Sequence, residues 1–458
     1  MCCKDERVKY FLYVHSNLTI WLGLFVLTLL IILAVQLVLL PFVFSEWHAG
    51  DGLLHGGDWV SFHYVAVKMA DNIRNVGWEA WELRPRGWMP AGVAGAIYAL
   101  TWPKPWTLAP LNAAVHATTA FLVFKLMLVF TADRKAAFIA ALPYVFFPSA
   151  MLWYTQIHRD GYNILGMLLF VFGILKIFKS DSNTGHQRWS EGLGLLAAIS
   201  GILLIWLVRP HALNIFYYVL MLIMLLLILY LSILVMQRKT HFKSALIKIL
   251  SLGLILLVIF SLSNTEGTSK YQREPQIEID EDYQWVRTKW LPGAIDNYFY
   301  SMAVIRSVEY PEKYGETASG IDYDVSMHSF TDYIFYLPRS LQIAFLAPFP
   351  SDWFKEGKYD STTFFRKVSA FEMLFIYMAL AALAYGAWVW RKRIETYIVL
   401  TFCTIMMLPT VFTVPNVGTI YRYRYGYLML LVSLGVAAFY QLVQTAREKK
   451  NEKVISCE

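Results

Sequence analysis

The sequence contains about ten long runs of apolar residues, and these constrain the fold more than any other feature. A helix needs roughly 20 apolar residues to cross the hydrocarbon core of a bilayer, and the runs are about that long. They are continuous rather than alternating, which excludes the strands of a membrane barrel. The chain is 57% hydrophobic and only 16% charged. We therefore predict an all-α integral membrane protein.

The apolar runs predict about ten transmembrane helices. Their expected positions are 18–44, 108–130, 135–153, 161–178, 192–208, 212–236, 245–263, 369–390, 396–412 and 425–443. The first run is too long for a signal-peptide core and lacks a small-residue cleavage site, so we expect it to stay as an anchor. No internal repeat is visible, which argues against a transporter built from inverted halves.

Basic residues cluster in alternate connections between the predicted helices. Examples are Arg134 with Lys135, and Arg391 with Lys392 and Arg393. The positive-inside rule then predicts that these connections and both termini are cytoplasmic. The net charge of +7 is explained by these clusters, so no nucleic-acid partner is expected. The four cysteines show no spacing typical of disulfides or zinc sites.

The remaining connections are expected on the outer face, and two of them are long. The chain is thus predicted to comprise an N-terminal transmembrane module (1–263), a second outer loop (264–368) and a C-terminal transmembrane module (369–458). The first outer loop is 45–107. It contains "DWVSFHYVAVKMADNIRNVGW", where Val60, Tyr64, Val67, Met69 and Ile73 suggest an amphipathic interfacial helix.

Two further apolar stretches in these loops are too short to span a bilayer. "WMPAGVAGAIYALTW" is predicted to form a second interfacial or re-entrant helix. "FTDYIFYLPRSLQIAFLAPFPSDW" is predicted to form interfacial helices interrupted by Pro338, Pro348 and Pro350.

Two acids follow the first apolar run, Asp51 and Asp58. Asp58 immediately precedes the predicted amphipathic helix, where an aspartate is a good N-cap. Alternatively, a carboxylate at the water edge of a membrane cavity can act as a general base toward a hydroxyl group. Only the second role predicts loss of activity in a folded protein.

Two short outer connections concentrate titratable residues. "QIHRDGY" holds His158, Arg159 and Asp160 in succession. In one interpretation, Arg159 and Asp160 form an ion pair and Asp160 caps the next helix. In the other, Asp160 is a metal ligand or an acid, and Arg159 binds a phosphate group. "VRPHALN" adds Arg209 and His211, which could be snorkelling side chains or parts of the same polar site.

A third basic cluster, "NVGTIYRYRYGY", holds Arg422 and Arg424 at the outer boundary of the last helix. Side chains two residues apart on a helix point about 200° apart, so both face one site only if this stretch is not fully helical. The arginine fork suits phosphate oxygens. Arg339 in "YLPRS" is a further candidate phosphate ligand.

In the order of its segments the chain resembles the GT-C glycosyltransferases, which include protein O-mannosyltransferases and the lipid A aminoarabinose transferase. The likeness rests on the acid after the first helix, "DWVSFHYVAVKMADNIRNVGW", "LAPLNAAVHATTAFLVFKLM" and "QIHRDG". The later "YLPRSLQIAFLAPFPSDW", a helix led by Glu372 and "NVGTIYRYRYGY" are similar to membrane proteins encoded with bacterial surface-polysaccharide genes. Unlike many members, this chain has a modest second loop and no large soluble C-terminal domain.

The resemblance implies sugar transfer from a polyprenyl-phosphate or polyprenyl-diphosphate donor to a glycan, lipid or protein acceptor. The reaction would take place on the outer face of the cytoplasmic membrane. The family's base maps to Asp58, with Asp51 as second choice, and its second-loop acid maps to Asp160. Residues near the donor phosphate map loosely to Arg159, Arg209, His211, Arg422 and Arg424. Some members use a divalent metal, which Asp58, Asp160 and His158 could bind.

Two other functions are alternatives to sugar transfer. A polymerase of O-antigen or capsule repeats would have a similar helix number and a diphosphate-lipid donor. A transporter of lipid-linked sugars would need polar groups through the middle of the membrane, whereas the polar clusters lie at one edge. A purely structural scaffold would leave three outer basic clusters unexplained.

Overall fold

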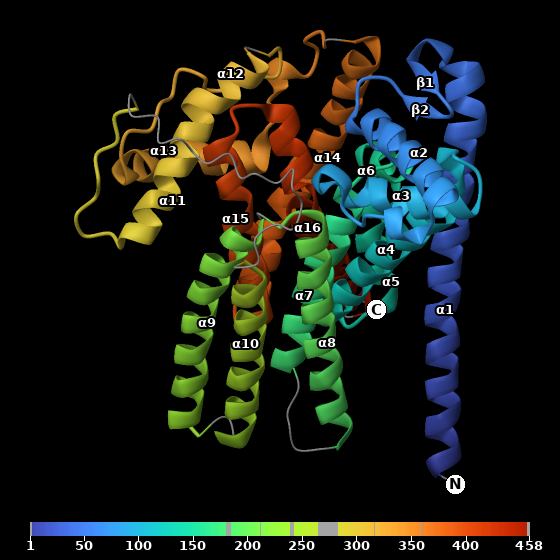
Figure 1. Cartoon of the computed structure of the whole chain (residues 1–458). Helices are drawn as coiled ribbons and strands as arrows, with labels where there is room; N and C mark the ends of the chain where they lie inside the picture. The colour runs from blue at the N-terminus through green and yellow to red at the C-terminus, as the bar shows by residue number, and fades with distance from the viewer. Residues whose placement is uncertain are drawn as a thin grey trace. The chain divides into compact units, whose positions relative to one another are not determined.

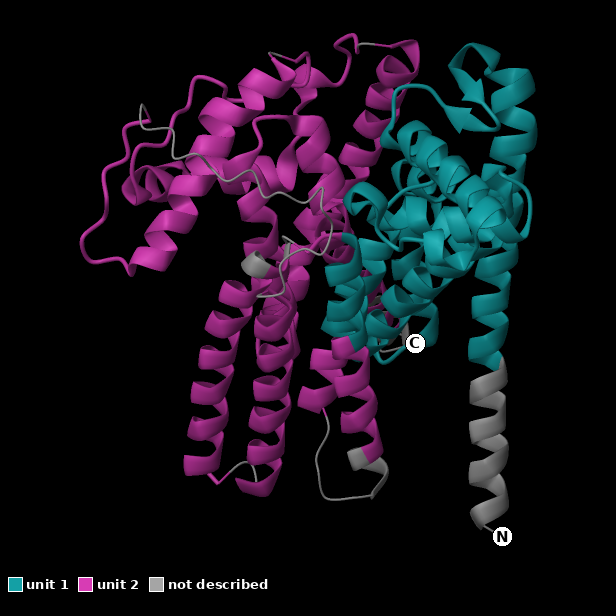
Figure 2. Ribbon diagram, in the orientation of Figure 1, with its two compact units in different colours: residues 1–172, 200–208 teal, residues 173–199, 209–458 magenta. Residues whose placement is uncertain are grey.

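We describe the protein from a computed structural model that covers residues 2–179, 185–210, 212–238, 242–263, 283–315, 317–357 and 359–455. The described residues are mostly helical, as predicted. The chain divides into two compact units (Figure 2). Unit 1 comprises Met1–Phe172 and Ser200–Val208, and unit 2 comprises Gly173–Ile199 and Arg209–Glu458.

Nine helices of the described residues are long and apolar enough to cross a membrane, in agreement with the predicted runs. They are Ser16–Val43, Pro105–Thr131, Asp160–Lys179, Trp189–Val208, Phe216–Met236, Phe242–Ser263, Asp360–Val389, Ile394–Thr413 and Val417–Glu448. This pattern is consistent with a multi-pass membrane protein.

The predicted helix at 135–153 is not one helix but two. Helices α5 (Arg134–Phe146) and α6 (Pro148–Tyr154) meet at an angle of 65°. Phe147 between them has an extended backbone, with ψ at 123°. A residue that precedes proline is disfavoured in the helical region, so Pro148 accounts for the break.

Unit 1 begins with α1 (Cys2–Ala34), which continues as a π-helical segment, η1 (Val35–Val43). A short antiparallel hairpin follows, made of β1 (His48–Gly50) and β2 (Leu53–Leu54). Helices α2 (Asp58–Val76) and α3 (Met89–Leu100) pack against each other, and α4 (Ala109–Thr131) packs on α1 and α5 (Figure 1). Helix α7 (Asp160–Lys179) begins in this unit.

Helix α2 confirms the predicted helix, and its position along the membrane surface stays a prediction. Met69 and Ile73 are buried against protein, whereas Val60 and Tyr64 are 38% and 55% exposed. The buried stripe is instead formed by Trp59, Phe62, Val65, Ala66, Met69, Ala70 and Ile73. The sequence carries two overlapping apolar stripes, and packing against α3 decides which one is enclosed.

Unit 2 contains the remaining helices. Their bounds are α8 (Gly185–Val208, which ends in unit 1), α9 (Ala212–Met236), α10 (Phe242–Ser263), α11 (Gly293–Val304), α12 (Tyr310–Tyr314), α13 (Phe330–Leu346), α14 (Asp360–Val389), α15 (Ile394–Thr413) and α16 (Val417–Ile455). A short π-helical segment, η6 (Ile305–Glu309), links α11 to α12. Helix α16 packs along α14 and α15.

Two expectations for unit 2 are corrected. Pro338 does not interrupt α13, which is continuous from Phe330 to Leu346. Proline leaves the carbonyl four residues earlier, that of Ile334, without its helical donor, and both residues lie on the exposed face of the helix. Glu372 does not lead a helix either. It lies in the middle of α14, where it is buried and accepts a hydrogen bond of 2.5 Å from the hydroxyl of Tyr421.

Candidate functional site

Asp51 occupies the tip of the hairpin that follows the first apolar helix. Its φ angle is 54°, and its neighbours Gly50 and Gly52 also have positive φ angles. Left-handed backbone is rare for residues other than glycine and is common at functional sites. The turn is held by the Gly52 amide, which donates to Nε2 of His48 over 2.8 Å. The carboxylate of Asp51 is therefore displayed on a tight, fixed turn.

The Asp51 carboxylate is the centre of a group that we call the acid cluster: Asp51, His63, Tyr98 and Lys104. Nζ of Lys104 lies 2.5 Å from Oδ1 of Asp51, and Nε2 of His63 lies 3.7 Å from Oδ2. On the other side of the imidazole, Nδ1 of His63 is 3.0 Å from the Tyr98 hydroxyl. The packing of α2 on α3 brings His63 and Tyr98 together.

The surroundings of the acid cluster favour neutral side chains at His63 and Tyr98. Burial lowers the pKa of His63, and Lys104 lowers it further, while Asp51 acts in the opposite direction. Burial raises the pKa of Tyr98, so its hydroxyl keeps its proton and can donate to Nδ1 of His63. The remaining imidazole proton is then on Nε2, on the side of Asp51. The cluster thus aligns a hydroxyl, an imidazole and a carboxylate.

Asp58 has different surroundings. One interpretation of the sequence made Asp58 the N-cap of α2. This is wrong, because α2 begins at Asp58 and its N-cap is Gly57. Asp58 is exposed in the first helical turn, where a carboxylate interacts favourably with the helix dipole. Its role as a general base stays a prediction.

The "QIHRDG" connection lies beside the start of α2 in unit 1. His158 and Asp160 are both 3% exposed, whereas Arg159 is half-buried. Nδ1 of His158 is 3.2 Å from both the backbone nitrogen and Oδ2 of Asp160. The indole rings of Trp59 and Trp153 lie 5.8 and 6.4 Å from the imidazole, centre to centre. This environment fixes the position of the imidazole.

A buried glutamine, Gln156, connects this loop to the hairpin of Asp51. Its Oε1 accepts from the Leu54 amide over 3.1 Å. Asn112 of α4 donates to the carbonyls of Tyr154 and Gln156 over 3.0 and 3.1 Å. Sequence reasoning missed Gln156 and Asn112, and also His63, Tyr98 and Lys104 of the acid cluster. The available signal was that Asn112 and His63 interrupt otherwise apolar helical stripes, whereas Gln156 lies in a connection without such a pattern.

The predicted metal ligands are only partly assembled. His158 and Asp160 are adjacent, but Asp58 lies exposed at the start of α2. In the parts of the chain that the structure describes, no three His, Cys, Asp or Glu side chains are grouped closely enough to bind a metal ion. Metal binding by Asp58, Asp160 and His158 remains a prediction.

In unit 2, Arg424 is fully enclosed by protein. Helix α16 begins at Val417, so Arg422 and Arg424 are both helical and point in different directions. Arg424 is 1% exposed, and its Nη1 donates to the carbonyls of Ile343 and Ala344 over 2.6 and 2.5 Å. Its Nη2 donates to the Ala347 carbonyl. These carbonyls form the end of α13, so Arg424 caps that helix.

Arg209 and Arg422 lie beside the same aromatic ring. The guanidinium carbons of Arg209 and Arg422 are 3.9 and 5.3 Å from the centre of the Tyr423 ring. Cation–π contacts of both arginines with one ring account for the middle tyrosine of "YRYRY". The third predicted member of this group, His211, lies outside the described residues.

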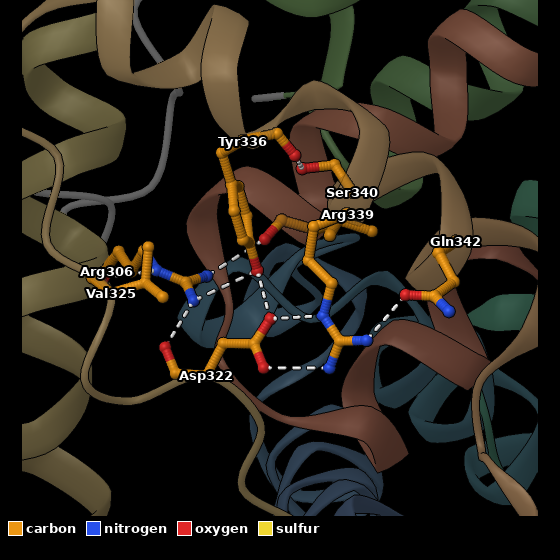
Figure 3. A network of polar contacts seen from close by, with 8 residues as sticks. Arg306, Asp322, Val325, Tyr336, Arg339, Ser340 and Gln342 are labelled. Atoms are coloured by element: carbon orange, nitrogen blue, oxygen red, sulfur yellow. Dashed lines mark hydrogen bonds and ion pairs between the residues drawn. The ribbon is translucent and has the colours of Figure 1, made fainter.

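Arg339 belongs to a polar network with Asp322 (Figure 3). Its Nε and Nη2 are 2.9 and 3.0 Å from the two carboxylate oxygens, and its Nη1 donates to Gln342 over 2.7 Å. The Tyr336 hydroxyl also donates to Asp322, over 2.9 Å. Burial raises the pKa of Asp322, but these hydrogen bonds outweigh burial and the pKa is lowered.

Arg306 completes this network from η6. It is buried, and it donates to the carbonyls of Asp322, Val325 and Val411 over 2.7, 3.2 and 3.1 Å. The guanidinium groups of Arg306 and Arg339 therefore hold the loop before α13 in place. Phosphate binding by Arg339 stays a prediction, and it would have to compete with the Asp322 carboxylate.

The predicted site residues are thus divided between the two units. Asp51, Asp58, His158, Arg159 and Asp160 belong to unit 1, whereas Arg209, Arg339, Arg422 and Arg424 belong to unit 2. The chain matches no family model, no curated protein and no solved structure.

Proposed function

We propose that the protein transfers a sugar from a polyprenyl-linked donor to an acceptor hydroxyl group. The proposal rests on the resemblance of its segments to GT-C glycosyltransferases. The observation that carries it furthest is the Asp51 carboxylate, which lies on a left-handed turn directly after the first apolar helix, within 3.7 Å of His63 and 2.5 Å of Lys104. A fixed carboxylate beside a neutral imidazole is suited to accepting a proton.

In this reaction the Asp51 carboxylate removes the proton of the acceptor hydroxyl group. The hydroxyl oxygen attacks the anomeric carbon of the donor sugar at the same time. The bond from that carbon to the donor phosphate oxygen breaks, and the configuration inverts. Negative charge then develops on the departing lipid phosphate, where arginine side chains stabilise it most. Arg424 is a poor candidate for this role, because its guanidinium binds three carbonyl oxygens.

The structure-based choice between the two acids is the reverse of the choice from resemblance. Both acids are exposed, and Asp51 lies on a tight turn with an imidazole and an ammonium group beside it. A general base must be held in a fixed position within reach of the proton that it removes. We therefore propose Asp51 as the base and Asp58 as a residue that stabilises the start of α2.

The experiment measures sugar transfer by purified protein in membranes that contain a radiolabelled pool of polyprenyl-linked sugars. It compares wild type with Asp51→Asn and Asp58→Asn, and with Asp71→Asn as a control, because Asp71 is an exposed acid of α2 paired with Arg74. We expect Asp51→Asn to lose transfer by at least about 100-fold, as for other general bases, and the two other variants to retain it.

The other outcomes of this assay separate the alternatives. Loss in Asp58→Asn alone would restore Asp58 as the base. Elongated products from single repeat units would identify a polymerase. No transfer by folded wild type, together with movement of labelled lipid between leaflets, would identify a transporter.

A further inference from the structure

The segment from Tyr283 to Pro292 presents an unusual combination of side chains at the surface of unit 2. Val286 and Trp290 are 66% and 71% exposed, which is high for large apolar residues. Arg287 and Lys289 alternate with them and are also exposed. They are the only charged residues between Tyr283 and Pro292. Aromatic rings next to basic groups are typical of segments that enter the headgroup region of a bilayer.

The segment is held in one conformation by a buried carboxylate. Asp296 of α11 is 1% exposed, and its two oxygens accept from Nε1 of Trp285 over 3.0 Å and from the Thr288 amide over 3.1 Å. The Val286 amide donates to the His328 carbonyl over 2.8 Å. The exposed rings are therefore displayed by a folded loop, and less conformational entropy is lost when they bind.

The exposed apolar surface continues onto α13. The ring of Trp290 lies 5.6 Å from that of Phe330, the first residue of α13. One turn further along, Ile334 and Phe335 are 48% and 80% exposed. Large apolar side chains exposed near one another are typical of interaction sites. We call Val286, Trp290, Ile334 and Phe335 the apolar edge.

The apolar edge lies at one end of the apolar helices of unit 2. Tyr298 of α11 packs on Tyr218, two residues into the membrane-length part of α9, with ring centres 5.9 Å apart. Figure 1 shows α11 and α13 beside one another at the left, above the end of α9. If α9 spans the bilayer, the apolar edge lies near the boundary between the hydrocarbon core and the lipid headgroups.

We propose that the apolar edge inserts into the outer leaflet and that Arg287 and Lys289 contact anionic phospholipid headgroups. The occupant is a lipid surface because the apolar residues adjoin basic ones, and because α11, which follows the segment, packs on the first turns of α9. Insertion would fix α11 and hence η6, whose Arg306 holds the loop of Asp322. The proposal does not depend on the sugar-transfer function.

The test is the depth of spin labels in nanodiscs of phosphatidylcholine mixed with phosphatidylglycerol. Cys2, Cys3 and Cys457 are changed to serine, while Cys403 is fully buried and stays. Single labels are placed by Val286→Cys and Trp290→Cys. Phe260→Cys in α10 is the lipid reference, since Phe260 is 51% exposed within an apolar helix, and Glu312→Cys on exposed α12 is the aqueous reference.

We expect labels at 286 and 290 to collide several-fold more often with oxygen than with a water-soluble nickel chelate, as at position 260. Collision patterns like that of position 312 would overturn the proposal. Exclusion of both reagents would also overturn it, because the edge would then be covered by protein, such as a second copy. Monodisperse elution of each labelled protein checks that it is folded.

Two further measurements test the parts of the proposal. Without phosphatidylglycerol, the label at 290 is expected to lie less deep, and an unchanged depth would overturn the roles of Arg287 and Lys289. Asp296→Asn places an amide nitrogen opposite Nε1 of Trp285 or the Thr288 amide. It is expected to raise the mobility of the label at 290, and an unchanged spectrum would overturn the role of Asp296.

Discussion

At the scale of residues, the surroundings of two neighbouring arginines differ completely. Arg424 is enclosed and donates to carbonyls at the end of α13, whereas Arg422 is half-buried beside Tyr423. A helix turns about 100° per residue, so a spacing of two separates their directions. Identical side chains in "YRYRY" thus have different surroundings, one enclosed at the end of α13 and one beside an aromatic ring.

Arg424→Lys is expected to destabilise the protein by about 2 kcal/mol or more, because one ammonium group cannot reach all three carbonyls that the planar guanidinium reaches. Thermal unfolding in detergent measures the loss. The control is Arg422→Lys, two residues earlier, which should unfold close to wild type. If instead Arg424→Lys unfolds normally and binds a polyprenyl phosphate less tightly, Arg424 is a phosphate ligand.

His63 predicts a pH dependence of stability. Its pKa is lowered in the folded protein from an ordinary value of 6.5, mainly by burial, with Lys104 adding to the effect and Asp51 opposing it. Because the unfolded chain takes up the proton first, the contribution of neutral His63 is complete above pH 6.5. It is lost as the pH falls through the folded pKa.

His63→Gln should therefore unfold at a temperature that depends less on pH than that of wild type, between about pH 7 and pH 5. The matched control is His55→Gln, because His55 is an exposed histidine that follows the same hairpin. Equal pH dependence in wild type and His63→Gln would show that His63 does not titrate differently in the folded protein.

At the scale of elements, glycines decide how closely two long helices approach. A Cβ atom on Gly435 of α16 would lie 1.9 Å from the carbonyl oxygen of Ala379 in α14, a distance that no real Cβ tolerates. Apolar helices in a membrane gain little from burying apolar surface against one another, so close backbone packing contributes a large part of their association.

Gly435→Ala is expected to separate α14 from α16 and to cost about 1–3 kcal/mol through overpacking. Gly253→Ala in α10 is the control, because nothing lies within 4 Å of the added Cβ. There, the better helix propensity of alanine should leave stability unchanged or raised by up to about 1 kcal/mol. Thermal unfolding in detergent compares them, and equal melting temperatures would contradict the packing argument.

At the scale of the whole molecule, the bent pair α5 and α6 decides the topology. The described residues contain nine helices that can each cross a membrane, and the bent pair raises the number to ten if it acts as one span. Ten crossings put both termini on the same side, whereas nine put them on opposite sides. The basic clusters at both ends favour the same, cytoplasmic side.

Fusions of a phosphatase that is active only outside the cytoplasm test this expectation. Attached after residue 458 or before residue 1, it should be inactive in both fusions, whereas a fusion in the loop before α2 should be active. Activity at the C-terminus alone would show that α5 and α6 do not cross the membrane together.

The sequence alone determined the helical class and, for the described residues, the number of apolar helices to within one. These features depend on local composition, because a backbone in lipid must satisfy its hydrogen bonds within each helix. The short helix of "WMPAGVAGAIYALTW" was likewise predictable, since its length excludes a span.

The tertiary structure decided which polar residues meet. Pairing of His63 with Asp51 and Tyr98, of Gln156 with the hairpin, and of Arg306 and Arg339 with Asp322 joins residues far apart in sequence. Val60 and Tyr64 became exposed because α3 encloses the other stripe of α2. Such outcomes depend on which helices pack together, and periodicity within one segment carries no information about its neighbours.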